Sequence, residues 1–269
     1  MLGVHTDLLF DPFGARWDQV QEAAIAAEAA GFDGVWTYDH LAGSVHRTSR
    51  VLECWTTLTA IAASVPRIMV GSMVLNVANR DPGTLAVMAA TLQEMSDGRL
   101  LLGIGAGGGR DTPYAAEQEA LGRQVGSDRV RRAAVEDTAT TLREVWSGAH
   151  GGASGFLRPD PSPPIIVGAF GPVMTELAGR VADGVNLSAS HPYLDSLLDT
   201  ARTAHRDAGR DPDHFLVTAS ASLSPEWLRP ESRQRERLAS LGVDRVVLFA
   251  RPQDVGAIVR AGSLLHDAA

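Results

Sequence analysis

Residues 81–109 read DPGTLAVMAATLQEMSDGRLLLGIGAGGG and join a helical pattern to an apolar run and a glycine-rich turn. Pro82 stands where the first turn of a helix tolerates a missing backbone N–H, so this segment predicts a helix over Pro82–Met95. The apolar run that follows predicts a strand over Arg99–Ile104. This run has no polar alternation, which is typical of a parallel strand with both faces buried.

The same succession of strand and helix extends over the whole chain. Strands are predicted at Leu2–Thr6, Gly34–Thr37, Ile68–Leu75, Arg99–Ile104, Ile165–Val167, Gly184–Leu187, Phe215–Ala219 and Arg245–Phe249. Helices are predicted at Trp17–Ala30, Glu53–Ala63, Pro82–Met95, Asp128–Trp146, Pro172–Ala182, Tyr193–Ala208, Glu231–Leu241 and Gln253–Leu265. Such alternation predicts a single (β/α)8 TIM barrel, one α/β domain over residues 1–269, although a doubly wound sheet alternates in the same way.

Composition excludes several classes of partner. The formal net charge of −8 does not favour nucleic acid or an anionic membrane surface. No apolar run approaches the ~20 residues of a membrane span, and the first residues lack the features of a signal peptide, so a cytoplasmic location is expected. Cys54 is the only cysteine, which excludes an internal disulfide and favours a packed core thiol.

The residue types also exclude several chemistries. The chain contains no lysine, so Schiff-base chemistry of the aldolase or pyridoxal-phosphate kind is excluded. The histidines show no metal-ligand spacing, and His5 is followed by Asp7 rather than by a second histidine two positions later, so no metal site is predicted. The chain has neither a G-x-S-x-G nucleophile turn nor a Walker loop.

Polar residues interrupt the apolar pattern at the ends of the predicted second and third strands. Asp39 and His40 follow the second strand, where a carboxylate and an imidazole at a barrel mouth can act as an acid/base pair or bind a cofactor. Gly71, Ser72 and Asn76 interrupt the third strand, which indicates a bulge or a close backbone approach. Each segment also has an alternative without a functional role. Asp39 would cap the following turn while His40 is solvated, and the third strand would be a slightly irregular buried strand.

Glycine-rich turns follow the predicted fourth and fifth strands. GIGAGGG at residues 103–109 contains the G-x-G-x-x-G spacing, which lets a backbone approach an anion. Three β/α units precede it, which favours a glycine wall at a barrel mouth over a dinucleotide fold. GAFGP at residues 168–172 ends at a helix start whose positive end would receive a phosphate. The long loops at 105–127 and 148–164 are expected to contain functional residues.

These segments resemble the luciferase-like monooxygenase superfamily, in particular its branch that uses the deazaflavin coenzyme F420. The resemblance is carried by AAEAAGFDGVWTYDHL, LECWTTLTAIAASVPRIMVGSMVL, DPGTLAVMAATLQEMSDGRLLLGIGAGGG and PPIIVGAFGPVMTELAGRVADGVNLS. It implies a barrel with the coenzyme ring at its mouth and a non-prolyl cis peptide at Met73–Val74. The residues that it places at the ring, the substrate or the phosphate are Asp39, His40, Ser72, Met73, Val74, Asn76, Ala106, Gly107, Gly108, Gly168, Ala169, Phe170 and Gly171.

The resemblance implies an oxidoreductase that passes a hydride between F420 and a small organic substrate. His40 would exchange the proton, and Asp39 would orient the coenzyme or that histidine. An FMN-dependent monooxygenase that uses O2 and a non-catalytic flavin-binding protein are the alternatives. Relatives that oxidise glucose 6-phosphate have a glutamate at the position of Gly108 and a lysine for the phosphate, so a different substrate is expected. Relatives often form dimers, so the resemblance also implies a homodimer.

Overall fold

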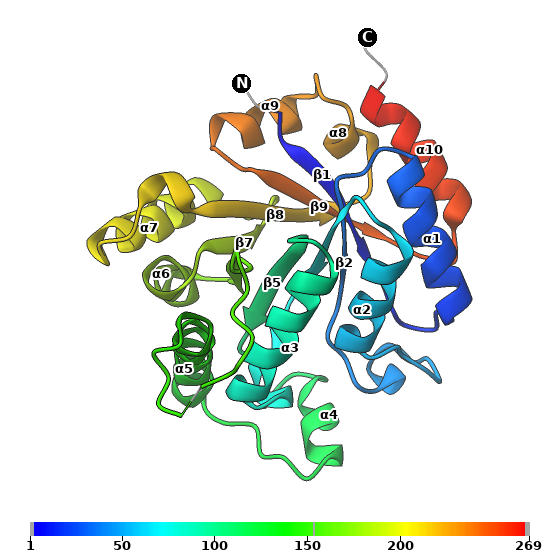
Figure 1. Cartoon of the computed structure of the whole chain (residues 1–269). Coiled ribbons are helices and arrows are strands. Elements are labelled where there is room, and N and C mark those ends of the chain that lie inside the picture. Colours follow the sequence, from blue (N-terminus) through cyan, green and yellow to red (C-terminus); the bar gives the residue numbers. More distant parts are fainter. Residues whose placement is uncertain (1–2, 153, 267–269) are drawn as a thin grey trace.

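The structure is a computed structural model that describes residues 3–152 and 154–266. Its strands lie at the centre and its helices surround them (Figure 1). The strands are β1 (His5–Phe10), β2 (Gly34–Thr37), β3 (Met69–Ser72), β4 (Leu75–Asn76), β5 (Leu100–Gly105), β6 (Ile165–Gly168), β7 (Gly184–Ser188), β8 (Leu216–Ser222) and β9 (Arg245–Ala250). The α-helices are α1 (Trp17–Ala29), α2 (Cys54–Ser64), α3 (Pro82–Met95), α4 (Ala115–Ala120), α5 (Asp128–Ser147), α6 (Pro172–Val181), α7 (Leu194–Asp207), α8 (Pro225–Leu228), α9 (Arg233–Ser240) and α10 (Val255–His266). Short 3-10 helices are η1 (Gly43–His46), η2 (Val77–Asn79) and η3 (Pro212–His214).

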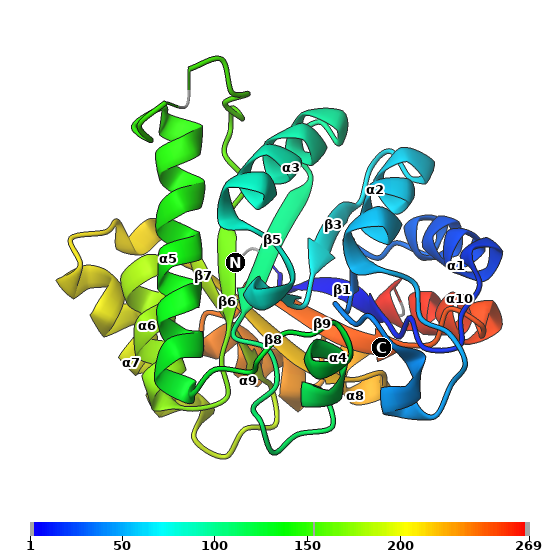
Figure 2. The same ribbon diagram turned by 90° about the horizontal axis from the view of Figure 1, so that it is seen from below.

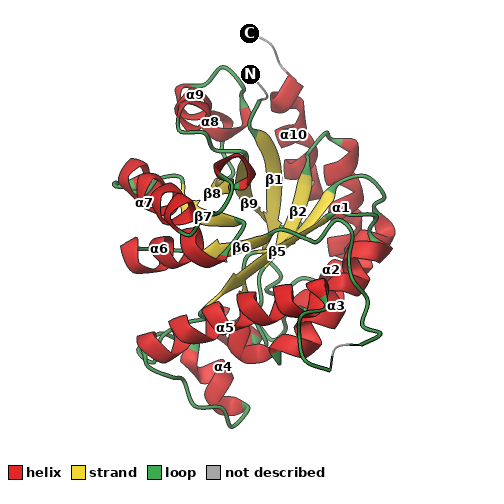
Figure 3. Cartoon of the chain, turned by 60° about the vertical axis from the view of Figure 1, so that its left-hand side comes forward, coloured by secondary structure: helices red, strands yellow, loops and turns green. Residues whose placement is uncertain are grey.

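The strands form one closed parallel sheet. Its order is β3-β2-β1-β9-β8-β7-β6-β5-β4, and β3 also pairs with β5, which closes the ring. Because β3 and β4 are two parts of one interrupted strand, the nine segments of the described chain make the eight strands of a barrel. Figures 2 and 3 show the helices arranged outside this sheet. The (β/α)8 prediction is therefore confirmed, and the doubly wound sheet, which has open edges, is excluded.

The first strand starts later than predicted. The sequence pattern predicts Leu2–Thr6, whereas β1 begins at His5 and continues to Phe10, and Leu2 lies outside the described residues. Asp7 breaks the apolar run in the sequence, but its buried carboxylate accepts hydrogen bonds of 2.7 Å from Nε and Nη2 of Arg245 on the neighbouring β9. An ion pair inside the barrel therefore continues the strand where the pattern indicates an end.

Three other elements differ from the predicted ones. The predicted third strand is broken between β3 and β4, and the predicted helix Glu231–Leu241 begins only at Arg233, after the separate short helix α8. The loop at 105–127 contains α4, which the sequence does not predict. A helix of six residues is too short for its periodicity to be recognised, and it depends on tertiary contacts for its stability.

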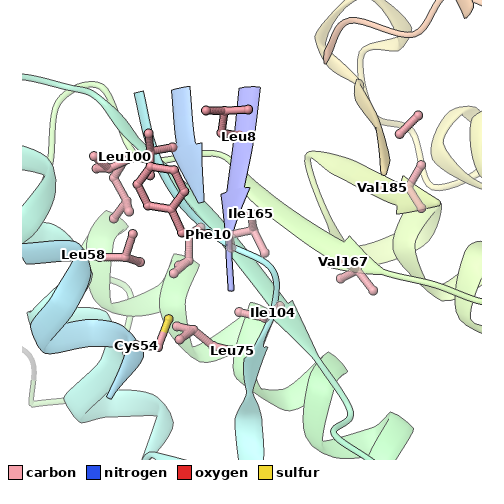
Figure 4. Close-up of a cluster of buried hydrophobic side chains, with 14 of the residues drawn as sticks. Leu8, Phe10, Cys54, Leu58, Leu75, Leu100, Ile104, Ile165, Val167 and Val185 are labelled. Carbon is pink, nitrogen blue, oxygen red and sulfur yellow. The ribbon is translucent and has the colours of Figure 1, made fainter. Parts of the chain in front are cut away.

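Apolar side chains pack on both sides of the strands. Figure 4 shows part of the layer between strands and helices, where Cys54 lies near Leu75. Cys54 is fully buried, as predicted for a core thiol, and burial raises the pKa of this thiol well above its ordinary value. The smaller layer inside the barrel consists of Leu9, Trp36, Met73, Leu101, Ile166 and Val247. Alternate residues of one strand enter the two layers, as a closed barrel requires.

Gly71→Ala is expected to lower the free energy of unfolding by about 1–3 kcal/mol, because overpacking a close-packed interior forces its neighbours to shift. A Cβ at position 71 would lie 2.3 Å from Cε3 of Trp36, which is fully buried. Urea unfolding measures the effect. Gly151→Ala is the control, since no described heavy atom lies within 4 Å of the added carbon. Equal stabilities of the two variants would contradict this account of the barrel interior.

Candidate active site

A cavity of about 480 Å³ opens at the carboxyl ends of the barrel strands. Its floor is apolar and includes Leu9, Met73 and Val74, while Asn186, Ser188 and Ser220 contribute polar atoms. Its walls include the backbone of Gly105–Gly107 and Gly168–Gly171. This volume is in the range of small-molecule sites, and this face of the barrel carries the active sites of the fold.

A bulge between β3 and β4 shapes the cavity floor. The Met73–Val74 peptide bond is cis, as the family resemblance implies. The Val74 side chain lies against two glycines: a Cβ on Gly105 would approach it to 2.5 Å, and a Cβ on Gly168 would approach it to 3.0 Å. Glycine is therefore needed at these positions to make room for the bulge, and the wall there is bare backbone.

Many of the predicted site residues meet at this cavity. Those that line it are Met73, Val74, Ala106, Gly107, Gly168, Ala169, Phe170 and Gly171. Ser72 does not, because it is fully buried and its hydroxyl donates to the Gly103 carbonyl at 2.8 Å. Asn76 and Gly108 line a neighbouring cavity of about 370 Å³, which shares Ala106 and Arg131 with the first.

Gly108 is packed closely against the loop that follows it. A Cβ at this position would lie 2.6 Å from Oγ1 of Thr112 and 2.6 Å from Cβ of Tyr114. Both residues belong to the segment that leads into α4, so the approach of this segment requires glycine at position 108. Gly108 thus lines the neighbouring cavity, and its contact with a phosphate-bearing tail stays a prediction.

Two arginines that sequence reasoning missed lie on the wall of the main cavity. Arg131 Nη1 donates to the carbonyls of Ala106 and Gly107, at 3.2 and 2.6 Å, and so holds the glycine turn. Arg132 lies on the same wall. Asp128 also lines it and pairs with Arg131 Nη2 at 2.7 Å, whereas among the described residues no carboxylate lies within ion-pair distance of Arg132.

The start of α6 borders the same cavity and adds to its suitability for an anion. Gly171 is the N-cap of this helix and has no side chain that could cap the first-turn N–H groups. Free N–H groups at a helix start bind anions readily. The sequence signal that could have revealed this basic wall is the cluster of arginines at residues 129–132, directly after the loop predicted to carry function.

Asp39 is held by four hydrogen bonds instead of facing either cavity. Its Oδ2 accepts from the backbone N–H of Asn76 at 2.9 Å, from Nδ2 of Asn79 at 3.0 Å and from Nη1 of Arg80 at 2.8 Å. Its Oδ1 accepts from Nη2 of Arg80 at 2.9 Å, and the carboxylate is fully buried. These bonds tie the end of β2 to the residues that follow the bulge, and none of them reaches His40.

Glu53, for which the sequence predicts no role, completes this network. It caps α2 by accepting from the N–H groups of Trp55 and Thr56 at 2.9 and 2.7 Å, and it also accepts from Nη2 of Arg80. Burial opposes the charge of Glu53, but the capping bonds and Arg80 outweigh it, so its pKa is lowered. Burial likewise opposes the charge of Arg80, but Asp39 and Glu53 raise the pKa of its guanidinium overall.

His40 lies in a second cavity of about 480 Å³ that shares Tyr38, Phe170 and Phe249 with the first. Its ring centroid is 4.9 Å from that of Phe13 and 5.1 Å from that of Tyr114. The remaining lining residues are Asp11, His46, Ala250 and Arg251. The two cavities are therefore neighbours across an aromatic boundary, and His40 lines the second one, whereas Arg131 and Arg132 line the first.

The carboxylate beside His40 comes from α4. Both carboxylate oxygens of Glu117 lie 3.3 Å from Nδ1 of His40. Sequence reasoning missed Glu117 because the two residues are 77 positions apart and α4 is not predicted.

Within residues 3–152 and 154–266, no three His, Cys, Asp or Glu side chains gather as metal ligands. No helix in that part of the chain has the length and hydrophobicity needed to span a bilayer.

Arg80→Met is expected to lower the free energy of unfolding by about 3–5 kcal/mol, because it leaves a buried carboxylate without its cation. Urea unfolding of the full chain measures this loss. Arg237→Met is the matched control, since the Arg237 and Asp195 side chains are 46% and 64% exposed where they pair, and exposed pairs contribute at most about 1 kcal/mol. A loss at Arg80 no greater than that at Arg237 would show that the Asp39 network is not a stabilising anchor.

Comparison with known proteins gives a consistent family assignment. Residues 4–250 match the family model described as luciferase-like monooxygenase. The chain is 31% identical over 233 residues to the F420-dependent glucose-6-phosphate dehydrogenase of Nakamurella multipartita, which covers 81% of this chain and 67% of that protein. It is 30% identical over 210 residues to the 5,10-methylenetetrahydromethanopterin reductase of Methanolobus tindarius, which covers 77% of this chain and 61% of the reductase.

Among solved structures, the fold is similar to that of an F420-dependent secondary alcohol dehydrogenase in complex with an F420-acetone adduct. The TM-score is 0.79 at 19% identity, and the superposition covers 99% of this chain and 100% of the other. At this identity the similarity concerns the fold, and it agrees with the closed barrel described above. The match to the family model over residues 4–250, together with the curated relatives, shows that this chain belongs to the luciferase-like monooxygenase family.

Proposed function

We propose that this chain is an oxidoreductase that transfers a hydride between coenzyme F420 and a small organic substrate. The observation that carries the proposal is the junction of two cavities, one with an apolar floor and a basic wall, the other with His40. A chain that brings an anionic redox coenzyme next to a proton-exchanging group needs this arrangement. The relative from Nakamurella multipartita, which is named as F420-dependent, supports the choice of coenzyme.

The residues of the main cavity fit this coenzyme. Leu9, Met73 and Val74 provide an apolar surface for a tricyclic ring, and the glycine wall leaves room for the ring beside the Val74 bulge. Arg132 and the first turn of α6 would hold the anionic tail. When bound, the coenzyme supplies a ring carbon that accepts or donates a hydride.

The His40 cavity would hold the substrate. Its walls are largely aromatic, and Arg251 is the basic residue other than histidine that contributes to them. The chain has no lysine, and position 108 carries glycine with no space for a side chain. An unphosphorylated organic molecule with an apolar body suits these walls better than a sugar phosphate does.

His40 would exchange the proton. When an alcohol is oxidised, its carbon–hydrogen bond gives up a hydride, its hydroxyl proton passes to His40 and a carbonyl group forms. In the reduction of a carbonyl compound, His40 returns the proton to oxygen. Burial raises the pKa of Tyr38, so this residue stays a phenol that can donate a hydrogen bond to the substrate oxygen.

The two alternative functions are less well supported. Monooxygenation with FMN would use the same cavity, but the relative from Nakamurella multipartita is named as F420-dependent. A non-catalytic flavin-binding protein would have no use for an imidazole paired with a buried carboxylate in a second cavity. The proposed hydride transfer uses this pair.

Titration of the purified chain with F420 and with FMN, followed by coenzyme fluorescence, tests the choice of coenzyme. F420 is expected to bind at least about tenfold more tightly, since each hydrogen bond to a charged group contributes about 1.5–3 kcal/mol and the F420 tail carries carboxylates in addition to its phosphate. Tight binding of FMN without binding of F420 would reverse the proposal. In the same titration, Arg132→Ala should weaken F420 binding, and the exposed neighbour Arg129 serves as the control when changed to Ala.

His40→Ala is expected to lower kcat/KM by about 10²–10⁴-fold, the contribution of a positioned acid or base, while F420 still binds. The probe substrates are 1-phenylethanol for oxidation and acetophenone for reduction, followed by the absorbance of F420. His46→Ala is the matched control, because His46 lines the same cavity but is exposed and should keep most of the activity. Turnover by His40→Ala equal to that of the unaltered chain would remove His40 from the mechanism.

A further inference from the structure

Helix α4 places a carboxylate against the imidazole of the second cavity. We infer that Glu117 is a positioning residue, which keeps the proton of His40 on Nδ1 and leaves Nε2 free to exchange a proton with the substrate. This inference rests on the proposed function for its catalytic consequence. Its structural content, the tautomer of His40, does not depend on any coenzyme.

The contacts of Glu117 leave few roles open to it. Its side chain is 5% exposed, and its two oxygens are equidistant from Nδ1 of His40 at 3.3 Å. Oε1 also accepts from the backbone N–H of Ala42 at 3.2 Å. A buried carboxylate accepts hydrogen bonds, so Nδ1 must carry the hydrogen that points at it. Nε2 is then the ring nitrogen with a free lone pair.

The position of Glu117 is held through its neighbour Gln118 and through Arg123, just beyond the end of α4. Gln118 Nε2 donates to Oδ1 of Asn79 at 2.6 Å, and Asn79 in turn donates to Asp39. Arg123 Nη1 donates to the same oxygen of Asn79 at 3.1 Å. The short helix is therefore fastened to the network that anchors the end of β2, the strand that leads into His40. The carboxylate and the imidazole are set by one connected group of polar contacts.

The packing of position 108 explains why the carboxylate comes from α4. Thr112 and Tyr114 occupy the space in which a side chain at position 108 would start. The segment that excludes a side chain there carries Glu117 to His40 a few residues later. When substrate oxidation transfers a proton to Nε2, the nearby carboxylate balances the charge of the imidazolium, as the acid of a catalytic triad does.

A purely structural role for Glu117 makes different predictions. If Glu117 only fastened the loop at Ala42, then Glu117→Gln, which keeps an oxygen acceptor for that N–H, would leave the reaction unchanged. If Glu117 positions and balances His40, then Glu117→Gln should lower kcat roughly 10²-fold, a part of the 10²–10⁴-fold contribution of acid–base catalysis. KM and F420 binding should stay within a factor of about three, and Glu117→Asp should recover part of kcat.

The direct test uses the full chain labelled with ¹⁵N-histidine, observed by long-range proton–nitrogen NMR at a pH where imidazole is neutral. The His40 signals are identified by their loss in His40→Gln. Nδ1 of His40 is expected to carry the hydrogen in the unaltered chain and in the control Glu119→Ala, a neighbour on the exposed face of α4. In Glu117→Ala the Nδ1–H form is expected to be lost.

A hydrogen on Nε2 of His40 in the unaltered chain, or identical His40 signals in Glu117→Ala, would overturn the inference. So would an unchanged kcat in Glu117→Gln. The tautomer measurement needs neither coenzyme nor substrate, so it decides the role of Glu117 even if the chain proves to bind FMN or to lack turnover with the probe alcohol. Failure of the proposed function and failure of this inference are thus distinguishable.

Discussion

The buried pair of Asp39 and Arg80 is the interaction on which the rest of the site depends. A carboxylate without exposure costs several kcal/mol unless its oxygens are satisfied, and four hydrogen bonds satisfy those of Asp39. Through Asn76 the pair holds the chain just after the Val74 bulge. Through Asn79 it holds α4, and through Arg80 it reaches the cap of α2. The floor of one cavity and the carboxylate of the other are therefore positioned by the same ion pair.

The two cavities divide the chemical requirements of the proposed reaction. The main cavity combines apolar side chains, glycine backbone and two arginines, while the second is lined largely by rings and holds the imidazole. Tyr38, Phe170 and Phe249 belong to both, so groups bound in the two spaces would meet at this aromatic boundary. Phe170 is 88% exposed, so it is the part of the boundary that packs least against the barrel.

The sequence predicts the barrel well because its signals are local and repeated. Each buried parallel strand is a short apolar run, each helix has recognisable ends, and the succession of both over eight units follows from neighbouring residues. The glycine turns at the ends of β5 and β6 are predicted in the same way, and they line the cavity. The cis peptide at Met73–Val74 came only from the family resemblance, since nothing in these two residue types indicates it.

What the sequence alone determined is the order and type of the main elements, the absence of lysine chemistry and the two glycine turns. The tertiary structure decided that Asp39 is an anchor, that Gly108 makes room for Tyr114, and that Glu117 and Arg132 face the site. The reason is physical: hydrogen bonds and ion pairs join residues about 40 to 80 positions apart, and their partners are determined only when the closed barrel brings its loops to one face. The sequence determines the chemistry of each side chain, but the packing of the folded chain determines which partner it contacts.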